Sequence, residues 1–153
     1  YTAWIKPTFP DSDGGSVIYK ESGTHFENGI DFRIYSNEDK SIRTTVADKD
    51  DNTLAESNQS ITDSTNLKSG EWYHITVTIS ADNNQVTATA YIDGKLEMSN
   101  TKTTWNGMTT TRPLYIGTFD RESGRYFVGQ LDDIRFYDRE LSNTEIEQIA
   151  SER

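Results

Sequence analysis

One aspartate of this chain, Asp132, falls in a sequence pattern that predicts a buried side chain. Residues 130–137 read QLDDIRFY and alternate, so Asp132, Ile134 and Phe136 share one face of an expected strand. If Ile134 and Phe136 face the core, Asp132 faces inward with them. A buried carboxylate needs hydrogen bonds, an ion pair or a metal, because desolvating it alone is unfavourable. We therefore expect a structural role for Asp132, as a metal ligand, an acceptor of backbone N–H groups or a partner of an arginine.

A set of oxygen-bearing side chains matches only part of the ligand pattern of a calcium-binding loop. Asp48, Asp50 and Asn52 have the spacing of the first three ligands of an EF-hand. The sixth position is Thr53 rather than glycine, and the twelfth is Gln59 rather than glutamate. Calcium needs about six to eight oxygen ligands, so we interpret this segment as a solvated acidic hairpin.

Trp105 lies in a threonine-rich segment, TKTTWNGMTTTR, that is typical of a loop. A loop tryptophan either takes part in recognition or caps the end of the fold, and the sequence leaves both alternatives open. The two histidines, His25 and His74, have no serine in a recognisable nucleophile motif nearby, and the chain has no cysteine. Nucleophilic catalysis is therefore not indicated.

Short β-prone runs between polar turns must position these residues. The segment EWYHITVTIS alternates, and Asp93-Gly94 is typical of a type I′ hairpin turn. Many such strands predict an all-β sandwich, with Trp4 and Trp72 in its core. Ser142 and Glu145 form a capping box, which predicts a short C-terminal helix that folds back onto the sandwich.

The length and charge of the chain limit the classes of partner. The 153 residues fit a single domain over residues 1–153, and their net charge of −10 argues against nucleic acids and anionic membranes. No apolar run approaches the roughly 20 residues that span a bilayer, so we expect no membrane insertion.

The segments AWIKPT, EWYHITVTIS, AYIDGK, LYIGTF and YFVGQLDDIRFYDRELSNTEI occur in the order found in laminin-G-like domains. The chain thus resembles this family, within the concanavalin A-like lectin/glucanase superfamily, and its closing segment also resembles pentraxins. The resemblance implies a two-sheet antiparallel jelly-roll. It also implies one more strand before AWIKP, pairing near the closing strand. Because the sequence starts at Tyr1, we expect either that its boundary trims this strand or that another segment or chain supplies it. A missing strand would leave an open sheet edge.

The resemblance implies a calcium site at one rim of the sandwich, formed by the stretches HFENGID and TFDRESG. The candidate calcium ligands are Glu27, Asn28, Asp31, Asp120 and Glu122, together with Asp132 if that residue binds metal. Tyr126, Arg121 and Arg125 flank the second stretch and are candidates for contact with a ligand, as is Trp105 in its threonine-rich loop. These residues can equally be ordinary polar loop residues.

Glucanases of the superfamily carry paired carboxylates on one strand, about 5 Å apart in retaining enzymes. This chain has no E-x-D-x-x-E run, and Glu27 and Asp31 are four residues apart with a glycine between them. We therefore expect a non-catalytic, carbohydrate-binding module of a secreted or surface protein, calcium-dependent at the rim and part of a larger protein. The alternative is a protein-interaction or adhesive domain of a bacterial adhesin, surface filament or phage particle, with a cell-surface protein as partner.

Overall fold

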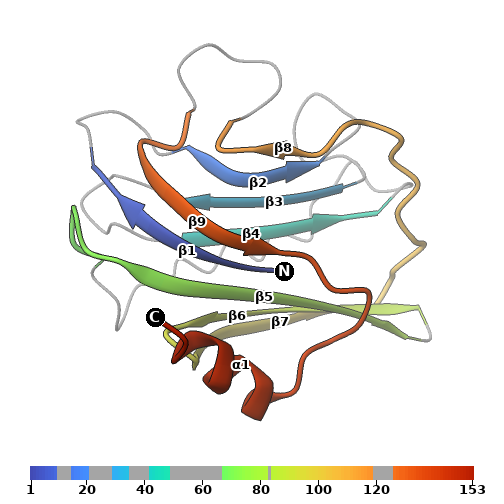
Figure 1. Ribbon diagram of the computed structural model, residues 1–153. Coiled ribbons are helices and arrows are strands. Elements are labelled where there is room, and N and C mark those ends of the chain that lie inside the picture. Colours follow the sequence, from blue (N-terminus) through green and yellow to red (C-terminus); the bar gives the residue numbers. More distant parts are fainter. Residues whose placement is uncertain (10–14, 21–28, 35–41, 49–66, 83, 119–125) are drawn as a thin grey trace.

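The computed structural model describes residues 1–9, 15–20, 29–34, 42–48, 67–82, 84–118 and 126–153. Its elements in chain order are β1 (Thr2–Pro7), β2 (Ser16–Lys20), β3 (Gly29–Ile34), β4 (Ile42–Ala47), β5 (Tyr73–Asp82), β6 (Gln85–Ile92), β7 (Lys95–Lys102), β8 (Tyr115–Ile116), β9 (Gly129–Arg135) and α1 (Asn143–Ala150). One antiparallel sheet has the order β7-β6-β5-β1-β9 and the other β4-β3-β2-β8 (Figure 1). The predicted two-sheet jelly-roll sandwich is confirmed.

The core lies between the two sheets and follows from alternation along the strands. On β5, Ile75 and Val77 are buried in the core, as the pattern of EWYHITVTIS predicts. The four-stranded sheet contributes Ile18 and Phe32 from its facing side. Burial of these apolar side chains supplies the main free energy that holds the sheets together.

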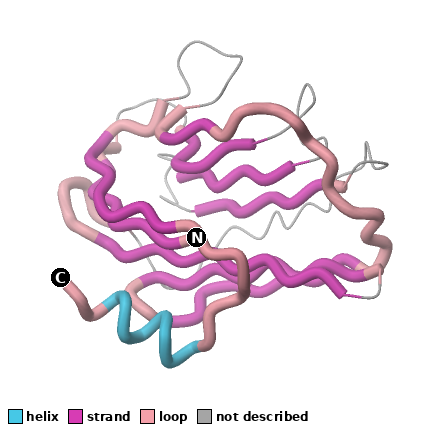
Figure 2. Tube along the Cα trace, turned by 45° about the vertical axis from the view of Figure 1, so that its right-hand side comes forward, coloured by secondary structure: helices cyan, strands magenta, loops and turns pink. Residues whose placement is uncertain are grey.

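The outer face of the five-stranded sheet is also covered, in part by α1 (Figure 2). Ile146 on the helix is fully buried, and Thr76 on β5 has no exposed surface. Ser142 Oγ accepts a hydrogen bond from Glu145 N, while Ser142 N donates to Glu145 Oε2, so the predicted capping box is present. The expectation that the helix folds back onto the sandwich is confirmed.

The hairpin between β6 and β7 forms at the predicted Asp93-Gly94 turn. Asp93 has φ of 49° and Gly94 has φ of 77°, the two positive values that a type I′ turn requires. A side chain on Gly94 would also place its Cβ 3.2 Å from Glu147 Cα. The glycine therefore serves both the turn and the close approach of α1.

The expectation that Trp4 and Trp72 lie in the core is wrong. Ala3 and Ile5 on β1 are fully buried between the sheets, so alternation turns Trp4 to the outer face. Trp72 directly precedes β5 and is likewise only partly buried. The sequence was misleading because both faces of this sheet carry large side chains.

Strand β9 lies at an edge of the five-stranded sheet. Within the part of the chain that the structure describes, it pairs with β1 alone, whereas β1 pairs with both β5 and β9. The additional strand that the family resemblance implies next to the closing strand stays a prediction.

Candidate functional site

The register of β2 separates two ends of the sandwich. Lys20 lies opposite Ile30 at the start of β3, whereas Ser16 lies opposite Arg33 near the end of β3. We call the first the Gly29 end, defined by Gly29, Ala47 and Asp48, and the second the Ser16 end, defined by Ser16, Thr118 and Tyr126. The two ends are separated by the length of β2, roughly 13 Å for four steps along a strand.

The stretches expected to share one calcium rim have their described flanks at opposite ends. Most of the expected site residues lie outside the described residues, namely Glu27, Asn28, Asp120, Arg121, Glu122 and Arg125. The first stretch leads into Gly29, and Asp31 follows on β3 opposite Thr45. The second leaves after Thr118, and its described continuation begins at Tyr126, which bridges to Ser16. The described flanks thus do not bring the two halves of the expected ligand set together.

Trp105 lies at the Gly29 end and is half-buried. Its side chain packs against a small cluster of Val46, Val86 and Ala88, and its backbone N–H donates to Asn84 O at 2.7 Å. The packing favours the interpretation in which Trp105 caps the end of the sandwich. Ligand contact by its remaining exposed surface stays a prediction.

Asp48, next to that cluster, is buried rather than solvated. Its side chain is only 1% exposed, and it lies 3.6 Å from Lys102 Nζ and accepts a hydrogen bond from Asn106 N at 3.3 Å. The interpretation of this aspartate as part of a solvated hairpin is wrong, because it joins the end of β4 to the segment that carries Trp105. Asp50 and Asn52 lie outside the described residues.

Tyr126 lies at the Ser16 end with 57% of its surface exposed. Its backbone passes so close to Gly15 that a Cβ there would lie 2.0 Å from the Tyr126 carbonyl carbon. Only glycine fits at this close approach of the two backbone segments. Gly15 therefore allows the backbone of Tyr126 to lie next to the start of β2. The ring is the most exposed aromatic side chain among the described residues.

Asp132 faces solvent, contrary to the expectation from alternation. Asp133 has a positive φ of 47°, and the register between β1 and β9 shifts here, so a β-bulge reverses the phase of the strand. Leu131 and Ile134 both pack against the core, while 63% of the Asp132 side chain is exposed.

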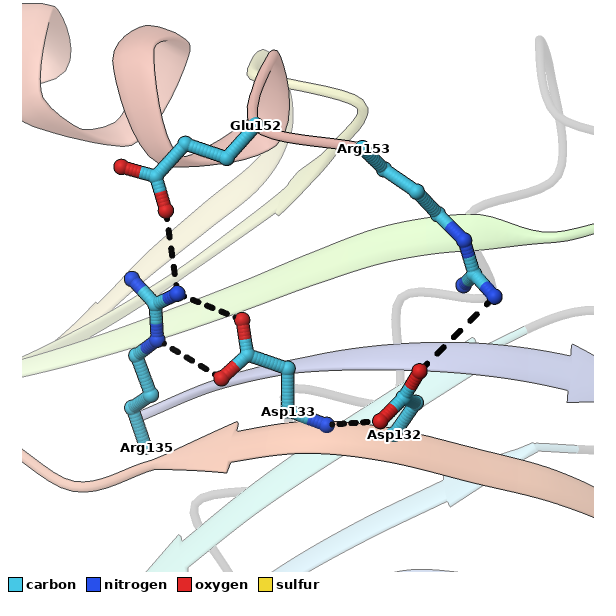
Figure 3. A network of polar contacts seen from close by, with 5 residues as sticks. All are labelled: Asp132, Asp133, Arg135, Glu152 and Arg153. Carbon is cyan, nitrogen blue, oxygen red and sulfur yellow. Dashed lines mark hydrogen bonds and ion pairs between the residues drawn. The ribbon is translucent and has the colours of Figure 1, made fainter.

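Two of the three roles foreseen for Asp132 are realised in part. Its Oδ1 accepts a hydrogen bond from Asp133 N at 2.9 Å, and its Oδ2 lies 3.8 Å from Arg153 Nη2 (Figure 3). Asp133 in turn binds Arg135, and this guanidinium lowers the pKa of the Asp133 carboxyl. The described residues contain no group of three or more His, Cys, Asp or Glu placed to hold a metal ion, and the metal role of Asp132 stays a prediction.

His74 is a buried structural histidine on the outer face of β5. Its ring meets Trp4 edge-on, with centroids 5.2 Å apart, and burial lowers its pKa below the usual 6.5. The Asp93 carboxylate accepts the His74 backbone N–H at 2.8 Å. The imidazole therefore packs as a neutral ring next to the hairpin turn.

The sandwich and its closing helix define a class of protein, the lectin- and glucanase-like jelly-rolls. Residues 1–147 match the family model Laminin_G_3, described as the concanavalin A-like lectin/glucanases superfamily. The chain belongs to this family. A search of the curated proteins finds no match to the chain. None of the helices in the described ranges has the length and apolar character needed to cross a membrane.

Proposed function

We propose that this domain is a non-catalytic, carbohydrate-binding module of a secreted or cell-surface protein. The observation that carries the proposal is the membership of residues 1–147 in the lectin and glucanase superfamily. Laminin-G-like domains are generally binding modules, and the sequence has no E-x-D-x-x-E run of the kind that supplies the paired carboxylates of the superfamily's glucanases. Fold alone does not choose a ligand, so the proposal needs a site.

Our proposed contact region is the Ser16 end, where the exposed Tyr126 ring can stack on the apolar face of a sugar. In the sequence Tyr126 follows Asp120, Arg121, Glu122 and Arg125, whose side chains would supply hydrogen bonds to sugar hydroxyls. Trp105 is the weaker candidate, because it is partly buried and packs against the cluster of Val46, Val86 and Ala88.

Calcium is the proposed cofactor, with carboxylate or amide oxygen ligands in one of two stretches rather than across both. The Ser16-end ligands would be Asp120 and Glu122, and the Gly29-end ligands would be Glu27, Asn28 and Asp31. The opposite flanks of these stretches support treating them as separate candidates.

Glycan binding by three single variants tests the location. Tyr126→Ala should reduce the affinity for a bound glycan by roughly tenfold, the loss typical of one stacked aromatic ring. Phe136→Ala is the matched control, since this ring is 50% exposed and lies beyond the other end of β9. Trp105→Ala should lower Tm through its lost packing. Equal losses of affinity for Tyr126→Ala and Phe136→Ala would remove the proposed site.

Thermal unfolding with calcium and with EDTA tests the metal. We expect calcium to raise Tm of the wild-type domain and EDTA to reverse the rise, because ligands that bind only the folded state stabilise it. The double variant D120N/E122Q should abolish the rise, whereas E27Q/D31N should retain it. The reverse pattern would move the metal to the Gly29 end, and no rise at all would remove calcium from the proposal.

A protein-interaction or adhesive function is the second candidate, favoured by the edge position of β9. An edge strand leaves backbone donors and acceptors that a partner strand can pair with. A domain that stays monomeric and binds no cell-surface protein, while binding glycans, would exclude this candidate.

A further inference from the structure

Two tryptophans, Trp4 and Trp72, lie under the same arginine side chain outside the core of the sandwich. Trp4 lies on β1 between Asp132 on β9 and His74 on β5, and Trp72 precedes β5. Both rings are partly exposed. Neither indole belongs to the core clusters among the described residues, so packing between the sheets does not explain them.

The side chain of Arg153 lies over both indoles. Its guanidinium carbon is 3.6 Å from the centroid of the Trp72 ring and 5.1 Å from that of Trp4. Its Nη2 lies 3.8 Å from Asp132 Oδ2 (Figure 3). Two aromatic faces and a carboxylate are the groups that attract a planar cation, because the ring quadrupole and the negative charge act together.

Two of the three groups that meet Arg153, Trp4 and Asp132, also make contacts that do not involve it. Trp4 stands on a strand that is paired on both sides, and its ring rests against His74. Asp132 is fixed by the bulge, where it accepts the Asp133 backbone N–H. A preorganised site loses little entropy when its ligand binds.

A separate set of contacts holds Arg153 in this position. Glu152, the residue before Arg153, accepts a hydrogen bond from Arg135 Nη2 at 3.0 Å, and Arg135 is bound in turn by Asp133. The segment after α1 therefore tethers a guanidinium next to the two tryptophans. With 36% of the Arg153 side chain and 63% of the Asp132 side chain exposed, the occupant lies within reach of solvent.

We propose that Trp4, Trp72 and Asp132 form a recognition site for a guanidinium group, the arginine side chain of a partner protein, and that Arg153 fills this site as an intramolecular ligand. A planar guanidinium stacks on indole better than an ammonium does, so the site favours arginine over lysine. Because a short tether holds Arg153 near the site, its effective concentration there is roughly millimolar. A partner's arginine must compete with this effective concentration to displace Arg153. The site is independent of the proposed glycan function.

Binding of N-acetyl-arginine-methylamide to the Arg153→Ala variant tests the proposal. The indole N–H signals of Trp4 and Trp72 are followed by NMR during the titration, with Trp105 as an internal reference. We expect saturable shifts at Trp4 and Trp72 only, and an apparent Kd at least about tenfold lower than in the wild-type domain, where the tethered arginine competes. The corresponding lysine compound should bind several-fold more weakly.

Matched variants separate recognition from general loosening of the helix. Arg139→Ala removes the ion pair with Glu145 at the other end of α1 and leaves Arg153 in place, so it should bind the compound as weakly as wild type. Adding Asp132→Asn to Arg153→Ala should weaken binding again. Arg153→Gln, which keeps a long polar side chain, replaces Arg153→Ala if the alanine variant is unfolded. The proposal would be overturned by the lack of a saturable shift in either Arg153 variant, by binding to Arg139→Ala as tight as to Arg153→Ala, or by no effect of Asp132→Asn.

Discussion

The backbone at Asp133 decides which side chains of β9 face solvent. A positive φ at this residue adds one position to the strand, so Leu131 and Ile134 both reach the core although they are three residues apart. Strict alternation predicts the opposite orientation for Asp132 and cannot foresee the bulge. The Asp-Asp pair between Leu131 and Ile134 was the available signal, since aspartate tolerates positive φ better than branched residues do.

At the same scale, Gly94 combines a positive φ with a close neighbour. Gly94→Ala should lower the free energy of unfolding by about 1–2 kcal/mol for the backbone alone, and further because the new Cβ would meet Glu147 Cα. Gly70→Ala is the control, because Gly70 has φ of 80° and a Cβ added there would have no atom within 4 Å. Urea denaturation measures both, and equal losses would contradict the packing of α1 on this turn.

The lowered pKa of His74 makes stability depend on pH. Because burial disfavours the imidazolium in the folded state, the unfolded chain takes up a proton first as the pH falls below about 6.5. The free energy of unfolding should therefore fall between pH 7.5 and 5.5. His74→Phe keeps an aromatic ring against Trp4 and should flatten this slope in urea unfolding. A slope unchanged in the variant would mean that other groups cause it.

At the scale of the element, the capping box determines where α1 begins. Glu145 accepts hydrogen bonds from Arg139 and from Ser142, and these contacts lower its pKa to about 2, so the carboxylate stays charged at neutral pH. Ser142→Ala should lower the free energy of unfolding by about 1 kcal/mol. Thr144→Ala, at an exposed position in the first turn of α1, should change the free energy of unfolding by less than about 0.5 kcal/mol. Similar values in urea denaturation would argue against the cap.

The elements that the sequence predicted well are those with strong local signals. Alternation along β5, the Asp93-Gly94 turn and the Ser142 cap each depend on neighbours in the chain, and each is present. The outward position of Trp4 depends instead on which face of β1 meets the other sheet. That choice is made by long-range packing of Ala3 and Ile5, which composition alone does not reveal.

The buried Asp48 escaped sequence reasoning for a similar reason. The acidic residues Asp50 and Asp51 that follow it suggest a solvated turn, but Lys102 and Asn106, which contact it, come from a segment more than fifty residues away. A carboxylate placed directly after a strand was the only local hint. Burial of a charge is tolerated here because an ammonium and a backbone N–H compensate it.

At the scale of the whole molecule, the register of the four-stranded sheet separates the candidate sites. Ser16 and Lys20 lie at opposite ends of β2. The family resemblance places the two expected calcium-binding stretches at one rim, but the described residues next to these stretches lie at opposite ends of the sandwich. Strand order is a long-range property, and no single stretch of sequence encodes it. Tyr126 and Trp105, on opposite ends, therefore belong to separate surfaces.

Net charge acts at this scale as well. With 25 acidic and 15 basic residues, the domain attracts cations and basic segments more readily than anionic surfaces. Both proposals, calcium in an acidic stretch and an arginine over Trp72, fit this excess of negative charge. Binding of the arginine compound should accordingly weaken as the salt concentration rises.

A glycan array probed with the wild-type domain, once in calcium and once in EDTA, tests the central proposal most directly. A carbohydrate-binding module predicts a defined set of bound glycans in calcium, lost in EDTA if the metal orders the site and retained if Tyr126 stacks alone. A folded domain that binds no glycan under either condition would contradict the proposal.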